Sequence, residues 1–174
     1  MKTLLMLGDS LVEWGDWPTL LPEYNVINRG MAGECTEGLA GRLIDEINST
    51  AEPDAVLIQS GTNNLLMGSP HFPAIHSSMV PTIRTFYPSC SIIISSLMPM
   101  SIIPSHKLEE INKQLQEITT QTENCFYLDM VPPFNEKCLP ITKPGFLNDQ
   151  VHLSTRGYQV WAEEIATFLQ DVLQ

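Results

Sequence analysis

Basic residues are scarce in this sequence. Nine Lys and Arg stand against 20 Asp and Glu, which gives a formal net charge of −11 over 174 residues. Proteins that bind nucleic acids or anionic membranes need a basic surface that attracts phosphates. The charge therefore argues against nucleic acid and against an anionic membrane as partners of this protein.

Long apolar runs are also absent. The run that follows Lys2 ends at Gly8 and Asp9, so it is shorter than the ~7–15 residues of a signal-peptide core, and no A-x-A cleavage site follows. No stretch approaches the ~20 apolar residues that a membrane-spanning helix needs. We therefore expect a soluble, cytoplasmic protein without stable membrane insertion.

Clustered cysteines are missing as well. The four cysteines are widely scattered, without a CxxC pair or a Cys/His cluster at metal-ligand spacing: Cys35, Cys90, Cys125 and Cys138. This pattern is typical of small, mostly buried thiols in a reducing compartment. We expect no metal site and no cofactor. The chain also lacks a G-x-S-x-G elbow, which excludes a motif match to the lipase fold that uses it.

The composition suits one globular domain. Hydrophobic residues make up 43% of the chain and charged residues only 17%, so the chain can build a core. A chain of this length buries roughly 70% of the surface that it exposes when unfolded. No repeat, low-complexity tract or linker-like shift in composition interrupts it. We expect a single domain over residues 1–174.

Two hydrophobic periods alternate along the chain. Short apolar runs bounded by Gly, Pro, Asn or Asp are typical of buried parallel strands, and they cover residues 3–7, 24–27, 55–58, 91–97 and 125–130. Stretches of helical period lie between and after them, most clearly from Tyr158 to Val172, where Ser154 is a plausible N-cap. Five strands alternating with about four helices predict a three-layer α/β/α fold with a five-stranded, mostly parallel sheet.

Two segments are harder to interpret. Residues 72–87 have a helical pattern that Pro81 either kinks or starts. Residues 131–151 contain four prolines and no clear period, and a loop of about twenty residues in a compact domain is uncommon and often functional. This loop follows the fifth strand, so it lies at the edge of the sheet where ligands bind in open α/β folds.

Polar residues that could take part in a reaction follow several strands at their carboxyl ends. They occur in four short blocks: Gly8-Asp9-Ser10-Leu11, Asn28-Arg29-Gly30 with Gly33 close behind, Gly61-Thr62-Asn63-Asn64, and Asp149-Gln150-Val151-His152 at the end of the long loop. Acyl transfer needs a nucleophile, a base, an orienting carboxylate and oxyanion donors. The four blocks together contain this set.

Each residue also has a simpler interpretation. Gly-Asp-Ser after a strand makes a good turn and helix cap, and Asn63 suits a turn. Asp149 is a candidate for an Asx-turn, and His152 for a cap or a hydrogen-bonded core residue. Only their co-occurrence at strand ends that the fold brings together favours chemistry. The other histidines have no matching partner nearby, and we expect them to be structural or on the surface: His71, His76 and His106.

In their order along nearly the whole chain, the four blocks resemble those of the GDSL esterase/lipase family, also called SGNH hydrolases. The resemblance implies a flavodoxin-like sheet order, and it implies these roles: Ser10 as nucleophile, supported by Asp9; His152 as base with Asp149 as its partner; and an oxyanion hole from the N–H groups of Ser10 and Gly30 and the side-chain amide of Asn63.

Two blocks depart from the family pattern. Asn64 stands where the third block commonly ends in Asp, next to the amide donor, and we expect little effect on the chemistry. Glu34-Cys35-Thr36 follows Gly33, where many members carry an Asp-Thr-like pair. This difference affects local packing more than activity.

The expected activity is hydrolysis of a small-molecule carboxylic ester through an acyl-enzyme, with short acyl or acetyl esters favoured and lysophospholipids or acyl thioesters also open. Trp14, Trp17 and residues 98–104 are candidates for an apolar pocket, or they simply pack the loops. Two alternatives remain: a carbohydrate O-acetyl esterase or acetyltransferase with the same triad, and a non-enzymatic flavodoxin-like module that binds a phosphate or a flavin. The oligomeric state cannot be inferred from the residues.

Overall fold

The computed structural model describes residues 1–139 and 144–173, and its centre is a five-stranded sheet. The strands are β1 (Lys2–Gly8), β2 (Tyr24–Gly30), β3 (Ala55–Gln59), β4 (Ser91–Ser95) and β5 (Cys125–Leu128), in the spatial order β2-β1-β3-β4-β5. All four neighbouring pairs are parallel. The order reverses next to β1, as in flavodoxin, so the carboxyl ends of β1 and β3 border a crevice where ligands bind in such sheets.

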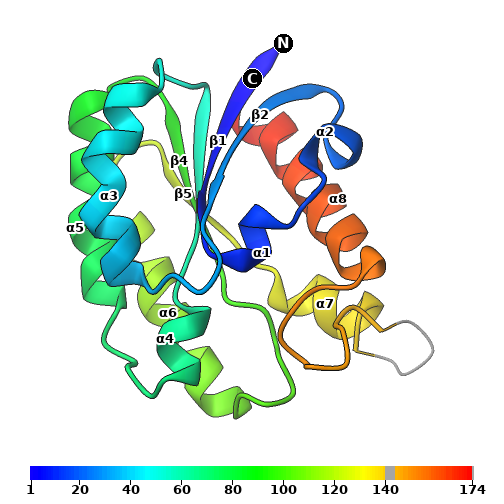
Figure 1. Ribbon diagram of the computed structural model, residues 1–174. Coiled ribbons are helices and arrows are strands. Elements are labelled where there is room, and N and C mark those ends of the chain that lie inside the picture. Colours follow the sequence, from blue (N-terminus) through cyan, green and yellow to red (C-terminus); the bar gives the residue numbers. More distant parts are fainter. Residues whose placement is uncertain (140–143, 174) are drawn as a thin grey trace.

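Helices cover both faces of the sheet (Figure 1), and this confirms the predicted three-layer α/β/α fold. One face carries α3 (Thr36–Ser49), α5 (Pro73–Phe86) and α6 (Ser105–Thr119); the other carries α1 (Ser10–Glu13), α2 (Trp17–Leu20), α7 (Val131–Lys137) and α8 (Thr155–Val172). The short α4 (Thr62–Leu66) follows β3. Within residues 1–139 and 144–173, no helix has the length and apolar character that would let it cross a membrane.

Alternation along the strands divides the core in two. In β1, Leu5 and Leu7 pack under α3, α5 and α6, whereas Leu4 and Met6 pack under α8. These side chains are at most 1% exposed, because the central strands are buried on both faces. The core on the face covered by α8 is rich in aromatic rings: Trp17 packs edge-on against Trp161 of α8, with ring centroids 5.1 Å apart.

Several details of the sequence-based description are corrected. Residues 131–137 form α7, although the proline-rich stretch from Val131 to Val151 was expected to be a loop. Pro132 and Pro133 occupy the first turn of α7, where a missing N–H costs nothing. Pro140, which belonged to the same expectation, lies outside the described residues. Helix α5 starts at Pro73 and contains Pro81 in its interior. The predicted cap of α8 is confirmed, since the Ser154 hydroxyl accepts a hydrogen bond from the Gly157 N–H at 3.2 Å.

Candidate active site

The nucleophile segment is the turn between β1 and α1. Asp9 is the N-cap of α1, and its Oδ1 accepts a hydrogen bond from the Leu11 N–H at 2.9 Å. The capping role that the Gly-Asp-Ser turn suggested therefore belongs to Asp9, which leaves the Ser10 hydroxyl available. Ser10 is 6% exposed and starts α1 at the carboxyl edge of the sheet.

The fold brings Ser10, His152 and Asp149 into one hydrogen-bonded chain, although Ser10 and His152 are 142 positions apart. The Ser10 Oγ lies 3.1 Å from His152 Nε2, and His152 Nδ1 lies 2.7 Å from Asp149 Oδ2. Both distances are within hydrogen-bonding range for a nucleophile, a base and an orienting carboxylate. The arrangement matches the geometry by which a Ser-His-Asp triad is recognised.

The Asp149 carboxylate has two tasks at once. Its Oδ1 accepts the backbone N–H groups of Val151 and His152, at 3.0 and 2.9 Å, which makes the Asx-turn that the sequence left open. Its Oδ2 binds the imidazole. Hydrogen bonds from His152 and from the two backbone N–H groups lower the pKa of Asp149 to about 2. At neutral pH the Asp149 carboxylate is ionised and can only accept hydrogen bonds. His152 Nδ1 must therefore carry the proton, and Nε2 is free to accept the Ser10 hydroxyl proton.

Asp9 is a buried carboxyl group beside this triad, with 1% of its surface exposed. Its Oδ2 has no hydrogen-bond partner within residues 1–139 and 144–173. Burial raises the pKa of Asp9 to about 7, while the Leu11 N–H and the nearby His152 oppose the rise. Asp9 is thus a carboxyl group with a pKa raised toward neutral pH, and it directly precedes the candidate nucleophile Ser10 in the chain.

Three groups were expected to supply the oxyanion hole, and the structure treats them differently. The Asn63 amide uses one hydrogen for the Glu34 carbonyl at 2.9 Å, which leaves its other hydrogen. The Ser10 N–H has no hydrogen bond to any residue that the structure describes. The expected role of Gly30 is not supported, because its N–H already donates to the Asn28 side chain at 2.9 Å.

Gly30 instead allows close packing of α1 against β2, and Gly33 has an N–H without a hydrogen-bond partner among the described residues. A Cβ on Gly30 would collide with the backbone of Glu13 and Asp9. Gly33 has φ +77°, is exposed, and a Cβ there would meet nothing within 4 Å. Its N–H makes no hydrogen bond within the described part of the chain. The turn after β2 thus presents the Gly33 N–H, while Gly30 lets α1 approach β2.

Glu34 and Asn64, the departures from the family pattern, hold this turn in place. The Glu34 carboxylate is bound by Arg42, with its Oε2 2.7 Å from Nη2 and its Oε1 2.8 Å from Nε. The same Nη2 donates to the Arg29 carbonyl at 2.8 Å. Asn64 accepts from the Thr36 N–H at 2.9 Å. Both substitutions are therefore built into the local hydrogen bonding.

Of the two tryptophans near Ser10, only Trp14 lies at the site. Trp17 is 1% exposed and donates its Nε1–H to the Val12 carbonyl at 2.8 Å, so it is a core residue. Trp14 is 52% exposed and stacks on the His152 ring, with centroids 4.1 Å apart and planes at 25°. Sequence reasoning missed this contact. The available signal was the spacing, because residues four apart share one face of a helical turn.

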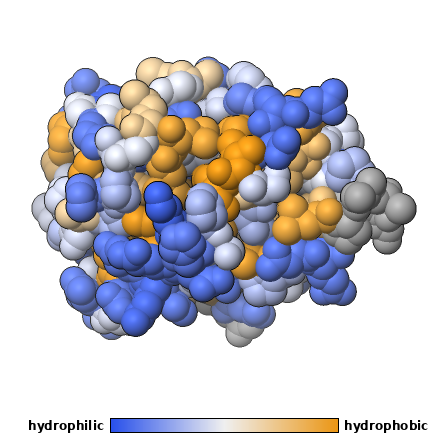
Figure 2. All heavy atoms as spheres, turned by 90° about the horizontal axis from the view of Figure 1, so that it is seen from below, coloured by the Kyte–Doolittle hydropathy of each residue, from blue (hydrophilic) through white to orange (hydrophobic). Residues whose placement is uncertain are grey.

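Exposed apolar side chains are frequent in the segments at the carboxyl edge of the sheet, the edge at which the triad lies. Figure 2 shows that face as an apolar band flanked by hydrophilic side chains. Large exposed apolar residues of the edge loops are Trp14, Met31, Leu66, Met67, Ile102, Leu139 and Leu147. A groove of about 490 Å³ runs beside Trp14, between it and residues of the loop before α8 such as Leu147 and Leu153. By contrast, Met98 and Met100 of the loop after β4 are buried and only pack the core.

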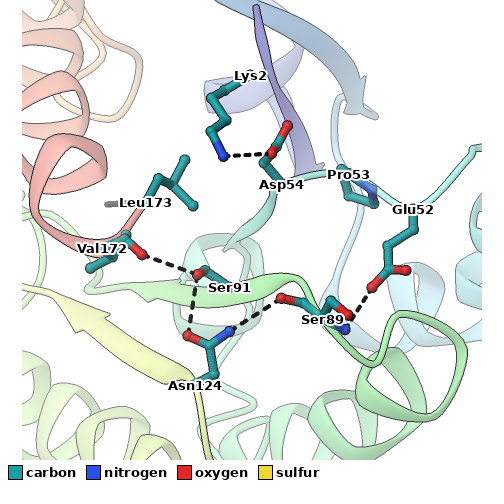
Figure 3. Close-up of a pocket in the computed structure, with 9 residues that line it drawn as sticks. All are labelled: Lys2, Glu52, Pro53, Asp54, Ser89, Ser91, Asn124, Val172 and Leu173. Atoms are coloured by element: carbon teal, nitrogen blue, oxygen red, sulfur yellow. Dashed lines mark hydrogen bonds and ion pairs between the residues drawn. The ribbon is translucent and has the colours of Figure 1, made fainter.

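A larger cavity of about 530 Å³ opens at the opposite, amino edge of the sheet (Figure 3). Its polar groups bind one another: Lys2 pairs with Asp54 at 3.1 Å, and the Ser91 hydroxyl donates to Asn124 at 3.2 Å. No histidine or cysteine lines it among the described residues. This cavity therefore offers no counterpart to the chain of Ser10, His152 and Asp149.

In the part of the chain that the structure describes, the other histidines and the cysteines form no second site of this kind. His76 is fully buried, with its Nε2 3.1 Å from the Ser60 carbonyl, and burial lowers its pKa to about 4. All four cysteines lie in the described part of the chain and are free thiols. Residues 1–139 and 144–173 contain no group of three or more His, Cys, Asp or Glu side chains placed to hold a metal ion.

Comparisons with known proteins identify similar sequences. A sequence model of the GDSL-like lipase/acylhydrolase family matches residues 6–160. The alpha1 subunit of platelet-activating factor acetylhydrolase IB from Rattus norvegicus is 24% identical over 163 residues, covering 89% of this chain and 69% of the relative. The human alpha2 subunit is 23% identical over 178 residues, covering 98% of this chain and 77% of the relative.

Solved structures show the same fold. An acetyl esterase structure with an acetate ion superposes with a TM-score of 0.82 at 18% identity, covering 99% of this chain and 98% of the other. A family 3 carbohydrate esterase from Clostridium thermocellum has a TM-score of 0.81 at 17% identity, covering 99% and 96%.

Proposed function

Because this chain belongs to the GDSL-like lipase/acylhydrolase family, we propose that it is a serine esterase that hydrolyses short-chain carboxylic esters, acetyl esters above all, with Ser10 as nucleophile. The observation that carries the proposal is the hydrogen-bonded chain from Ser10 through His152 to Asp149. Membership of the family makes the protein an acylhydrolase. A flavodoxin-like binding module would have no use for this chain of side chains.

The first half of the reaction uses the triad directly. The Ser10 Oγ attacks the ester carbonyl carbon while His152 Nε2 takes its proton, and the imidazolium that forms is stabilised by Asp149. As the tetrahedral intermediate collapses, the bond from carbon to the alcohol oxygen breaks, and His152 returns the proton to that oxygen. The acyl group then remains on Ser10.

The second half repeats these steps with water. His152 removes a proton from a water molecule, whose oxygen attacks the acyl carbon. Collapse of the second tetrahedral intermediate breaks the bond to the Ser10 Oγ, which regains its proton from His152. The products are a carboxylic acid and the regenerated enzyme.

The oxyanion that develops in both halves would be stabilised by the Ser10 and Gly33 N–H groups and by the free amide hydrogen of Asn63. Gly33 replaces Gly30 in this set, since the Gly30 N–H is engaged by Asn28. Each such donor contributes typically ~10²–10³ in turnover. Glu34 supports the arrangement, because its carbonyl fixes Asn63 and its carboxylate is fixed by Arg42.

The acetyl group is the feature that the names of several relatives share. One is named as an acetylhydrolase of platelet-activating factor, and one is named as an acetyl esterase. The apolar side chains around the triad suit an uncharged ester, and the net charge of −11 disfavours strongly anionic substrates. The presence of carbohydrate esterases among the structural neighbours favours acetylated sugars as the second candidate class.

The test begins with a serine-directed fluorophosphonate and with p-nitrophenyl esters of two to sixteen carbons. We expect stoichiometric labelling of Ser10 and fastest turnover of the shortest esters, with both lost in Ser10→Ala and turnover lost in His152→Ala. Ser78→Ala and His106→Ala are matched controls, because they remove the same side chains from exposed positions of α5 and α6. Labelling or turnover that persists in Ser10→Ala would overturn the assignment.

A second panel separates the substrate classes. Acetylated monosaccharides, an acetylated xylan and a phospholipid with an acetyl ester are compared at equal ester concentration. Preference for the sugar esters assigns the carbohydrate class, whereas preference for the phospholipid assigns the lipid class. An optimum at long acyl chains would contradict the short-chain proposal.

A further inference from the structure

Trp14 is a large aromatic side chain that remains half exposed next to the catalytic candidate His152. Its ring centroid lies 4.1 Å from that of the imidazole, with an angle of 25° between the planes. Trp14 directly follows α1, and its N–H donates to the Ser10 carbonyl at 3.1 Å, so the nucleophile and the stacking ring share one helical turn. The ring has no packing role comparable to that of Trp17 in the core.

The stack on Trp14 adds a contact to the face of the His152 ring, whose two nitrogens are already hydrogen-bonded. Asp149 fixes the Nδ1 end of the ring at 2.7 Å, and Ser10 meets the Nε2 end at 3.1 Å. Both contacts are made by ring nitrogens, whose hydrogen bonds lie near the plane of the imidazole, so they hold the ring at its edge and not at its faces. An aromatic ring against one face opposes tilting of the imidazole out of these hydrogen bonds.

We propose that Trp14 is a positioning residue that fixes the plane of the His152 ring over Ser10 and stabilises the imidazolium formed during acyl transfer. This inference rests on the proposed function. Indole is the side chain that attracts a cation most strongly through its ring face. His152 is neutral before attack and positively charged while it holds the Ser10 proton, so the attraction is greatest when the barrier is being crossed.

Two carboxyl groups also face His152. Asp149 approaches it from the same loop and Asp9 from the end of β1, and a positive charge on His152 acts to lower the pKa of each carboxyl group. Ser10 of α1 completes the surroundings as a neutral hydrogen-bonding group. Trp14 differs from the two carboxyl groups because it is uncharged and contacts a face of the ring, and its contribution is therefore separable from theirs.

Steady-state kinetics with p-nitrophenyl acetate test the positioning role. We expect Trp14→Leu to lower kcat by roughly 3–30-fold with KM within about twofold of wild type, and Trp14→Phe to retain an intermediate kcat. Phe86→Leu is the matched control, because it removes an exposed aromatic ring at the end of α5, outside the candidate site. A thermal melt should place both variants near wild type, since Trp14 is 52% exposed.

Fluorescence provides a readout that needs no activity. A protonated imidazole stacked on an indole quenches its emission, so the fluorescence of the wild type should fall as His152 takes up a proton. This step should be absent from Trp14→Phe and from His152→Gln. Trp17 and Trp161 are at most 1% exposed, and their emission should stay constant.

The outcomes separate the two claims. If Ser10→Ala is inactive but Trp14→Leu has the kcat of the wild type, the positioning role is refuted and the esterase proposal stands. A rise in KM alone would also refute it, because it would make Trp14 a substrate-binding residue. If Ser10→Ala is as active as the wild type, the esterase proposal fails, while the fluorescence step still reports whether Trp14 senses the charge of His152.

Discussion

The buried carboxyl group of Asp9 predicts an unusual stability profile. Asp9 is 1% exposed and burial raises its pKa to about 7, from the usual 3.8. Between about pH 4 and pH 7 the folded state holds a proton that the unfolded state has released. The contribution of Asp9 to the free energy of unfolding therefore falls as the pH rises through this range and is lowest above pH 7.

Asp9→Asn removes this penalty without removing the helix cap. The asparagine Oδ1 can accept the Leu11 N–H as Asp9 does at 2.9 Å, and Asn and Asp are equally good N-caps. A pKa difference of roughly 3 units sets a ceiling of about 4 kcal/mol on the gain. Relaxation around the charge lowers it, and we expect the variant to be more stable than the wild type by ~2 kcal/mol at pH 8.

Urea unfolding at pH 8 and pH 4.5 measures the effect. The gain from Asp9→Asn should be present at pH 8 and largely gone at pH 4.5, where the wild-type carboxyl is protonated. Asp45→Asn is the matched control, because it changes the net charge equally at an exposed position of α3. An Asp9→Asn variant that is no more stable than the wild type at pH 8 would refute the reasoning.

Two further predictions concern the triad and the oxyanion hole. Asp149→Asn should lower kcat by roughly 10²–10⁴, because an amide donor facing Nδ1 of His152 selects the wrong tautomer; activity within tenfold of wild type would contradict the role of Asp149. Asn63→Ala should lower kcat by roughly 10²–10³ with a smaller change in KM, measured with p-nitrophenyl acetate, and a change confined to KM would argue against an oxyanion donor.

The sequence predicted the sheet well because its central strands β1, β3 and β4 are buried on both faces. Continuous apolar runs such as residues 55–58 have few other interpretations, and all five strands appear where the runs are. The short helices α1, α2 and α4 were missed, since four or five residues cannot show a helical period. Helix α7 was missed for another reason: Pro132 and Pro133 read as breakers, whereas they start the helix.

The site could be predicted only as far as strand ends determine it. Ser10 and Asn63 follow β1 and β3, and parallel strands place such residues along one edge. Whether the Gly30 N–H is available as an oxyanion donor could not be predicted from the sequence, because this depends on its hydrogen-bond partner. In the structure it donates to the Asn28 side chain. The stack of Trp14 on His152 joins segments that are far apart in the sequence. The spacing of four residues predicts that Trp14 lies on the same face as Ser10, but it does not predict that His152 is the stacking partner.

The precision of the triad depends on how α8 is tied to α1. Ser10 and Trp14 come from the turn after β1, whereas Asp149 and His152 come from the loop that leads into α8. Tyr158 of α8 donates its hydroxyl to the Leu11 carbonyl at 2.9 Å, across 147 positions of the chain.

The aromatic core reinforces this connection. Trp17, just after α1, packs edge-on against both Tyr158 and Trp161 of α8, with centroids 6.0 and 5.1 Å apart. Two rigid contacts therefore join the segments that carry the nucleophile and the base. A triad needs its members held within about 0.5 Å, and loops alone rarely achieve this. Under the proposed function, the buried cluster around Trp17 therefore serves the reaction as well as stability, because it joins the segments that carry Ser10 and His152.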